Sequence, residues 1–126
     1  MESTSARKIL WTVTDPRGLT ISLAEDVWQN HLAYRPELAS HFEQVRLTAQ
    51  DPDAIYFDPD STAEKSPGTR VYWYYKSGVL AGKFSRNWVA AVVKVVVEAD
   101  AIRTGYVETA LLPRRVLNRL VLEWKK

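Results

Sequence analysis

The sequence contains no cysteine and only two histidines, His31 and His41. Without cysteine the chain can form neither a disulfide bond nor a thiolate nucleophile, and zinc sites built from cysteine are excluded. The two histidines stand ten positions apart, and the acidic stretch 51–60 lacks the glycine and the terminal glutamate of a calcium-binding loop. We therefore expect neither a metal site nor a cofactor.

Long apolar segments are also missing. The longest apolar run, WVAAVV over residues 88–93, ends at Lys94, far short of the roughly 20 residues that a membrane-spanning helix needs. The first ten residues hold no apolar segment of the kind found in signal peptides. With 126 residues, 46% hydrophobic and 25% charged, the composition predicts a single cytoplasmic domain over residues 1–126 with no membrane partner.

Charge is distributed unevenly along the chain. Residues 1–66 carry 6 Lys and Arg against 11 Asp and Glu, whereas residues 67–126 carry 11 against 4. The net charge therefore changes from −5 in the first part to +7 in the second. A basic half of this kind is typical of proteins that bind a polyanion such as RNA, and an oppositely charged protein partner would suit the same pattern.

The first fifty residues predict a hairpin followed by two helices. Alternating segments at 8–14 and 19–23 are joined by DPRG, a turn with proline and glycine at favourable positions. Residues 23–35 place Trp28 and His31 on one apolar stripe of a helix. A second helix is predicted to start at Pro36 and to bury Leu38, Phe42 and Val45.

The remainder of the chain predicts mainly sheet. We expect a short strand at 54–58, a long loop at 59–69, strands at 70–76, 79–84, 88–98 and 102–112, and a short helix over 113–126. The predicted fold class is α+β: an N-terminal hairpin, two helices packed on one face of an antiparallel sheet, and a short C-terminal helix. The other face of the sheet is left for function. The sheet face that packs on the helices is predicted to contain Val71, Trp73, Val93, Val95 and Val97.

The strand RVYWYYK, residues 70–76, combines aromatic and basic side chains. Alternation puts Arg70, Tyr72, Tyr74 and Lys76 on one face. Aromatic rings stack on RNA bases and cations hold phosphates, so this face suits single-stranded RNA. Tyrosine is also a common residue of ordinary strands, and that alternative has comparable weight.

The stretch RTGYVETALLP, residues 103–113, places Thr104 and Tyr106 on one strand face with Gly105 between them. A glycine weakens a strand unless a bulge or a close approach is needed, which gives this strand a reason to lie at a site. His31 has a pKa suited to acid or base catalysis, but its apolar stripe also fits a core histidine. From the pattern alone, ordinary structure is the stronger interpretation for both features.

Taken in order, these motifs resemble the phage-associated nuclease-like families of the barnase–EndoU–colicin E5/D–RelE group. The resemblance covers residues 26–110, a nuclease-like core that excludes the N-terminal hairpin and the predicted helix at 113–126. It departs from the family pattern at Arg35, where a second histidine is common, and at Gly105, where alanine is usual. The motifs that carry it are Trp28 with His31, Pro36-Glu37, DPDAIYFD, Tyr74-Tyr75, VVKVVV and Thr104-Gly105-Tyr106.

The resemblance implies a toxin-like or phage-associated endoribonuclease that needs no metal and cleaves RNA by attack of the 2′-hydroxyl on the adjacent phosphate. Such a reaction needs a base, an acid and cations that stabilise the charged phosphorane. His31 is then the candidate base or acid, Arg70 and Arg103 stabilise charge, Thr104 orients a phosphate oxygen, and Tyr106 stacks or donates a proton. The residues predicted to bind RNA are Tyr72, Tyr74, Lys76, Lys83, Arg86 and Lys94.

The alternative is a module of the same fold that binds RNA or a protein without turnover. A toxin-like nuclease would be expected to have a cognate antitoxin as its partner, whereas the binding module would suit a phage structural protein. The sequence alone does not separate the nuclease from the binding module.

Overall fold

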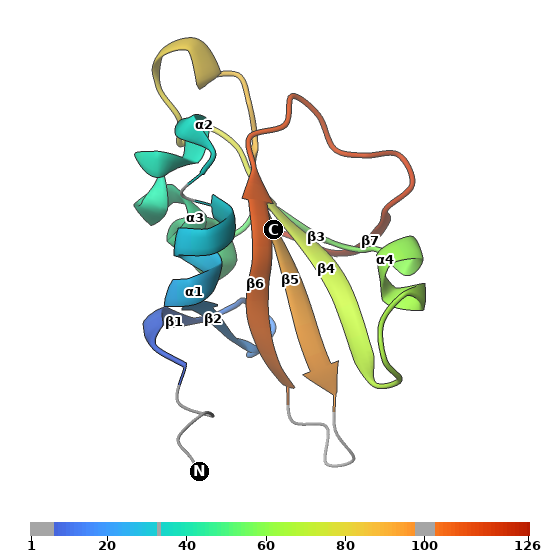
Figure 1. The fold of residues 1–126 in the computed structure, drawn as a ribbon. Coiled ribbons are helices and arrows are strands. Elements are labelled where there is room, and N and C mark those ends of the chain that lie inside the picture. Colours follow the sequence, from blue (N-terminus) through green and yellow to red (C-terminus); the bar gives the residue numbers. More distant parts are fainter. Residues whose placement is uncertain (1–6, 33, 98–102) are drawn as a thin grey trace.

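In a computed structural model, which describes residues 7–32, 34–97 and 103–126, the described chain forms one mixed sheet of seven strands (Figure 1). Its order is β1-β2-β6-β5-β4-β3-β7. Neighbouring strands are antiparallel except β2 and β6, which run parallel. The fold class is therefore α+β, as predicted. The strands are β1 (Ile9–Thr14), β2 (Thr20–Ala24), β3 (Ala54–Phe57), β4 (Thr69–Lys76), β5 (Val89–Val97), β6 (Arg103–Leu111) and β7 (Val121–Lys125).

The helices are short, and α3 packs against the strands β5, β1 and β4. A π-helical turn, η2 (Trp28–Leu32), continues α1, and a 3₁₀ turn, η3 (Gly82–Phe84), precedes β5. Figure 1 shows α1, α2 and α3 together on one side of β6, whereas α4 lies beside β4 on the opposite side. Within the described residues, no helix combines the length and the apolar character needed to cross a membrane. The α-helices are α1 (Glu25–Val27), α2 (Pro36–Ala39), α3 (Phe42–Gln50) and α4 (Pro59–Ala63).

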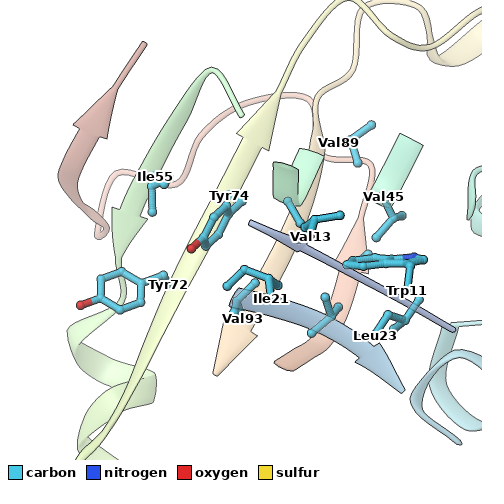
Figure 2. Close-up of a cluster of buried hydrophobic side chains, with 14 of the residues drawn as sticks. Trp11, Val13, Ile21, Leu23, Val45, Ile55, Tyr72, Tyr74, Val89 and Val93 are labelled. Carbon is cyan, nitrogen blue, oxygen red and sulfur yellow. The ribbon is translucent and has the colours of Figure 1, made fainter. Parts of the chain in front are cut away.

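The main core lies on the face of the sheet that carries Tyr72, Tyr74, Val93, Val95 and Gly105, which we call the first face. Cross-strand pairs fix this assignment, since Tyr72 pairs with Val93 and Gly105 pairs with Val95. The β1–β2 hairpin and α3 cover this face (Figure 2). Burial of each large aliphatic side chain here stabilises the fold by roughly 1.5–3 kcal/mol. The hairpin and α3 contribute the buried side chains Trp11, Val13, Leu19, Ile21, Leu23, Val45 and Ala49.

The opposite face, called the second face, carries Val71, Trp73, Val92, Lys94 and Tyr106. The prediction that Val71 and Trp73 pack beside Val93 and Val95 is therefore wrong for β4. Both faces of β4 are covered, so alternating hydrophobicity does not distinguish them.

The prediction of a C-terminal helix over residues 113–126 is wrong. It holds no helix and ends in β7, which pairs antiparallel with β3, so that Ala54 lies opposite Lys125. Without β7, the backbone of β3 would be unpaired on one side, and this demand outweighs the helical spacing of Val116, Leu120 and Trp124. Leu120 packs in a small second-face cluster with Tyr75 and Ala90.

Two further predicted elements differ. Residues 79–84, predicted as a strand, contain η3 instead, and Gly82 takes a left-handed φ of 67°, which a strand does not accommodate. The predicted loop at 59–69 begins with α4, because the Asp58 side chain accepts a hydrogen bond from the Ser61 N–H and Pro59 occupies the first turn.

Candidate nucleic-acid interface

The structure distributes the predicted site residues between two ends of the sheet. Arg70 pairs with Val95 near one end of β5. The backbone of Arg103 pairs with Val97 at that same end. Lys83 and Arg86 lie beyond the other end of β5, in η3 and the turn that follows it. At about 3.3 Å per strand residue, the two groups are separated by roughly 25 Å.

The predicted catalytic residues are also divided between the two faces. Thr104 and Tyr106 alternate with Gly105, so they lie on the second face, and Tyr106 pairs with Lys94 there. Arg70 lies on the first face, where it lines a cavity with Tyr72. The side chains of His31 and Arg103 lie outside the described part of the structure. The described members therefore do not form a single catalytic cluster.

For three of the residues predicted to bind RNA, the prediction is wrong because their side chains are buried. Tyr74 is fully buried and Tyr72 is 7% exposed, so neither ring is open for stacking on a base. Lys76 is also buried, and its ammonium donates to the Asp51 backbone carbonyl at 2.7 Å. Both tyrosines belong to the first-face core, and Lys76 fixes the turn after α3.

Gly105 has a packing role rather than a site role. A Cβ at this position would lie 2.8 Å from Ile21 Cδ1 and 2.8 Å from Val93 Cγ1. Glycine allows β2 and the first-face core to approach β6 closely. The glycine therefore does mark a close approach to the strand, as its position predicted, but the atoms that approach belong to the protein's own core and not to a ligand.

Three cations gather at the end of the sheet that holds η3. Lys83, Arg86 and Arg114 line a cavity of about 430 Å³ together with Ser85 and Asn87. We call this group of three cations the basic edge. Lys83 and Arg86 were predicted, whereas Arg114 lies in the segment predicted as a C-terminal helix and was not predicted as a site residue.

Two hydrogen bonds hold the basic edge together. The Asn87 side-chain amide donates to the Leu112 carbonyl at 2.6 Å, and the Trp88 N–H donates to the Pro113 carbonyl at 2.8 Å. These bonds extend the pairing of β5 with β6 past the last strand residues. They keep Arg114 beside Arg86 although the two are far apart in sequence.

The charges of the basic edge are not neutralised within the described structure. No acidic side chain lines the cavity, and none of the three cations makes an ion pair with a described residue. All three side chains belong to exposed residues. Such a cluster produces a positive potential that attracts phosphate groups.

A second cavity, of about 240 Å³, lies over the second face and α1. Its lining includes Arg7, Lys94, Tyr106 and Glu108, and we call it the second-face cavity. The Arg7 guanidinium lies 5.6 Å from the Tyr106 ring centroid, and Glu108 is bound by Lys65 at 2.7 Å. Tyr106 and Lys94 were predicted as site residues. Arg7 and Glu108 were not, because the sequence offers no motif at either residue, only its charge.

Among the described residues, no three His, Cys, Asp or Glu side chains come together as a metal site would require. No family model, curated protein or solved structure matches the chain. The family resemblance drawn from the sequence motifs therefore stays a prediction.

Proposed function

We propose that this protein binds single-stranded RNA through the basic edge. The observation that carries the proposal is the cavity lined by Lys83, Arg86 and Arg114 without an acidic side chain. The net charge of +7 over residues 67–126 favours a polyanion, and the motifs that resemble an RNA-cleaving family favour RNA among polyanions.

The physical basis is the release of counterions. A phosphate chain in solution is surrounded by condensed cations, and a protein cation that replaces one of them gains the entropy of its release. Cations already paired with carboxylates gain less, because the pair must first be broken. The unpaired cations of the basic edge meet this condition better than Arg119 or Lys126, which are bound to aspartates.

The test compares two triple variants that lose the same charge. Lys83→Ala/Arg86→Ala/Arg114→Ala removes the basic edge, and Lys8→Ala/Arg46→Ala/Lys125→Ala removes three cations elsewhere on the surface. Binding of a labelled oligouridine is measured by fluorescence anisotropy over a salt titration. The first variant should lower the log–log salt slope by about 2 and weaken binding about tenfold or more at low salt, whereas the control should change both much less. Equal losses in the two variants would reduce the proposal to a general effect of net charge.

RNA cleavage is a second candidate function, favoured by the second-face cavity. There Glu108, paired with Lys65, lines the same cavity as Lys94, as Arg7, which is paired with Asp26, and as the phenol of Tyr106. In the proposed reaction Glu108 takes the proton of the 2′-hydroxyl, the 2′-oxygen bonds to phosphorus, and the bond from phosphorus to the 5′-oxygen breaks. The Tyr106 hydroxyl protonates the departing 5′-oxygen, and the cations stabilise the charged phosphorane.

Cleavage of RNA by the purified chain in the presence of a chelator tests this second function. Glu108→Gln should lower the rate about 100-fold or more, and Tyr106→Phe should lower it less, while binding at the basic edge is retained. Glu64→Gln, at the exposed residue that follows α4, serves as the control for the loss of a carboxylate. Cleavage that survives Glu108→Gln undiminished would exclude this cavity as the site.

A further inference from the structure

A cavity of about 350 Å³ lies on the first face, at the end of the sheet opposite the basic edge. Two arginines, Arg17 and Arg70, line it together with Tyr72. Its apolar wall consists of Leu19, Val95 and Val97. The cavity therefore offers two guanidinium groups and a phenol beside an apolar surface, and its lining contains no acidic side chain.

The turn between β1 and β2 fixes the position of Arg17. The buried Asp15 carboxylate accepts hydrogen bonds from the N–H groups of Arg17 and Leu19, both at 2.8 Å. The other Asp15 oxygen accepts the Tyr74 hydroxyl. Gly18 completes the turn with a left-handed φ of 87°. These hydrogen bonds hold the turn that carries Arg17 in one conformation.

The Arg17 guanidinium forms an ion pair with the Asp15 carboxylate at 3.7 Å but makes no direct hydrogen bond to it. Its Cζ lies 4.7 Å from the centroid of the Tyr72 ring, and one amino group lies 3.4 Å from the Tyr74 hydroxyl. The buried Nε makes no hydrogen bond, and its distance to the Asp15 carboxylate is 3.7 Å. The Arg17 side chain is partly exposed and lines the cavity, so an anion there can accept hydrogen bonds from its amino groups.

Arg70 supplies the second, adjustable charge. It is exposed, and its interaction with the Tyr72 hydroxyl, with a smaller contribution from the Glu123 charge, raises its pKa. Two guanidinium groups match a doubly charged oxyanion, because each can donate two parallel N–H bonds to it. The buried Leu19 and Val95 side chains form a surface on which the uncharged part of a ligand can pack.

We propose that this cavity binds a phosphate monoester of a small, flat apolar group. The two arginines bind the phosphate, Tyr72 adds a hydrogen bond, and the apolar group lies on Leu19, Val95 and Val97. The volume lies within the usual range for a small-molecule site, of about 300–1,000 Å³. The site does not depend on RNA binding, since the basic edge lies at the other end of β5.

Phenyl phosphate is the probe that combines the two features, and isothermal titration calorimetry with the full chain measures its binding. Inorganic phosphate supplies the charge alone, phenol the ring alone, and benzoate a singly charged carboxylate. Phenyl phosphate should bind about tenfold tighter than any of the three, because only it satisfies both arginines and the apolar wall. Equal affinity for phenyl phosphate and inorganic phosphate would overturn the proposal of an ester ligand.

Arg70→Gln tests the site without disturbing the turn between β1 and β2, because Arg70 is exposed. It should weaken phenyl phosphate binding about tenfold or more and change oligouridine binding no more than Arg46→Gln does. Arg46→Gln, which removes an equal charge from α3, should leave phenyl phosphate binding unchanged, and so should the triple variant of the basic edge. An unaltered affinity in Arg70→Gln, an equal loss in Arg46→Gln, or displacement of phenyl phosphate by oligouridine would each refute a separate small-molecule site.

Discussion

Two aspartates, Asp15 and Asp58, each precede a proline and are each buried against β4, but on opposite faces of the sheet. Asp15 accepts the Tyr74 hydroxyl on the first face, and Asp58 accepts the Trp73 indole N–H on the second face. Each carboxylate also accepts a backbone N–H from the turn or helix that follows it. We call each aspartate, with the turn or helix that follows it, a corner. The two corners attach the β1–β2 hairpin and α4 to neighbouring residues of β4.

The two corners differ in how closely an arginine binds the aspartate. Arg119 donates directly to the Asp58 carboxylate, so its charge is used to fasten the segment before β7 onto α4. Arg17 lies 3.7 Å from the Asp15 carboxylate and packs over the Tyr72 ring at the edge of a cavity. The Arg119 charge is therefore taken up by a direct bond within the fold, whereas Arg17 makes no such bond and lines the first-face cavity.

The largest expected effect is at Asp15. Asp15→Ala removes the acceptor of two backbone N–H groups and of the Tyr74 hydroxyl, and each buried donor left unpaired costs about 1–3 kcal/mol. We expect the free energy of unfolding, measured by urea denaturation, to fall by about 4 kcal/mol. Tyr74→Phe removes one of these bonds and should cost roughly 1–2 kcal/mol. A loss below about 1 kcal/mol in Asp15→Ala would show that the corner does not hold the hairpin.

Asp58 should give a smaller effect that depends on pH. Burial opposes its charge, but hydrogen bonds from Arg119, the Ser61 N–H and Trp73 outweigh this and lower the pKa to about 2. Because the unfolded value is about 3.9, the stabilisation is present above pH 4 and is lost as the pH falls from about 4 to 2. Asp58→Asn should therefore cost about 2 kcal/mol at pH 7 and flatten the acid limb of the stability curve.

The control for this titration is Asp26→Asn. A hydrogen bond from Arg7 also lowers the pKa of Asp26, but that carboxylate is exposed. The acid limb should change less in this variant than in Asp58→Asn. If both variants flatten the acid limb of the stability curve equally, the buried Asp58 contributes no more to the pH dependence of stability than the exposed Asp26.

The smallest expected effect tests the packing of the hairpin onto β6. Gly105→Ala places a methyl group against Ile21 and Val93 and should destabilise the fold by about 1.5 kcal/mol. Ile21→Val removes the crowded Cδ1, so the double variant should lose less stability than the sum of the single variants. Thermal unfolding of the four proteins measures this coupling, and strict additivity would mean that the two side chains do not meet.

The sequence predicted those elements whose signal is local. The DPRG turn between alternating segments identified the β1–β2 hairpin, and the valine-rich run identified β5. The strand at Ala54–Phe57 was also predicted from its own residues. Each of these segments carries its own turn or periodicity, so no distant contact was needed to recognise it.

Elements that depend on distant partners were not predicted. The five residues VLEWK form a strand because β3 lacks a neighbour, a fact that their own pattern does not contain. The face on which Tyr74 lies depends on Asp15, 59 positions away in the sequence. At the candidate interface the same rule holds: Lys83 and Arg86 follow from one basic turn, whereas Arg114 joins them only through the continued pairing of β5 with β6.

The parallel pairing of β2 with β6 has a consequence for the order of folding. Thr20 pairs with Thr104, so the hairpin must wait for a strand synthesised 84 residues later. Until β6 emerges from the ribosome, β2 has only β1 as a neighbour, and its apolar side chains remain accessible to chaperones. Contacts this distant also slow the search for the native state, and we expect folding in milliseconds to seconds, typical of chains dominated by non-local strand pairs.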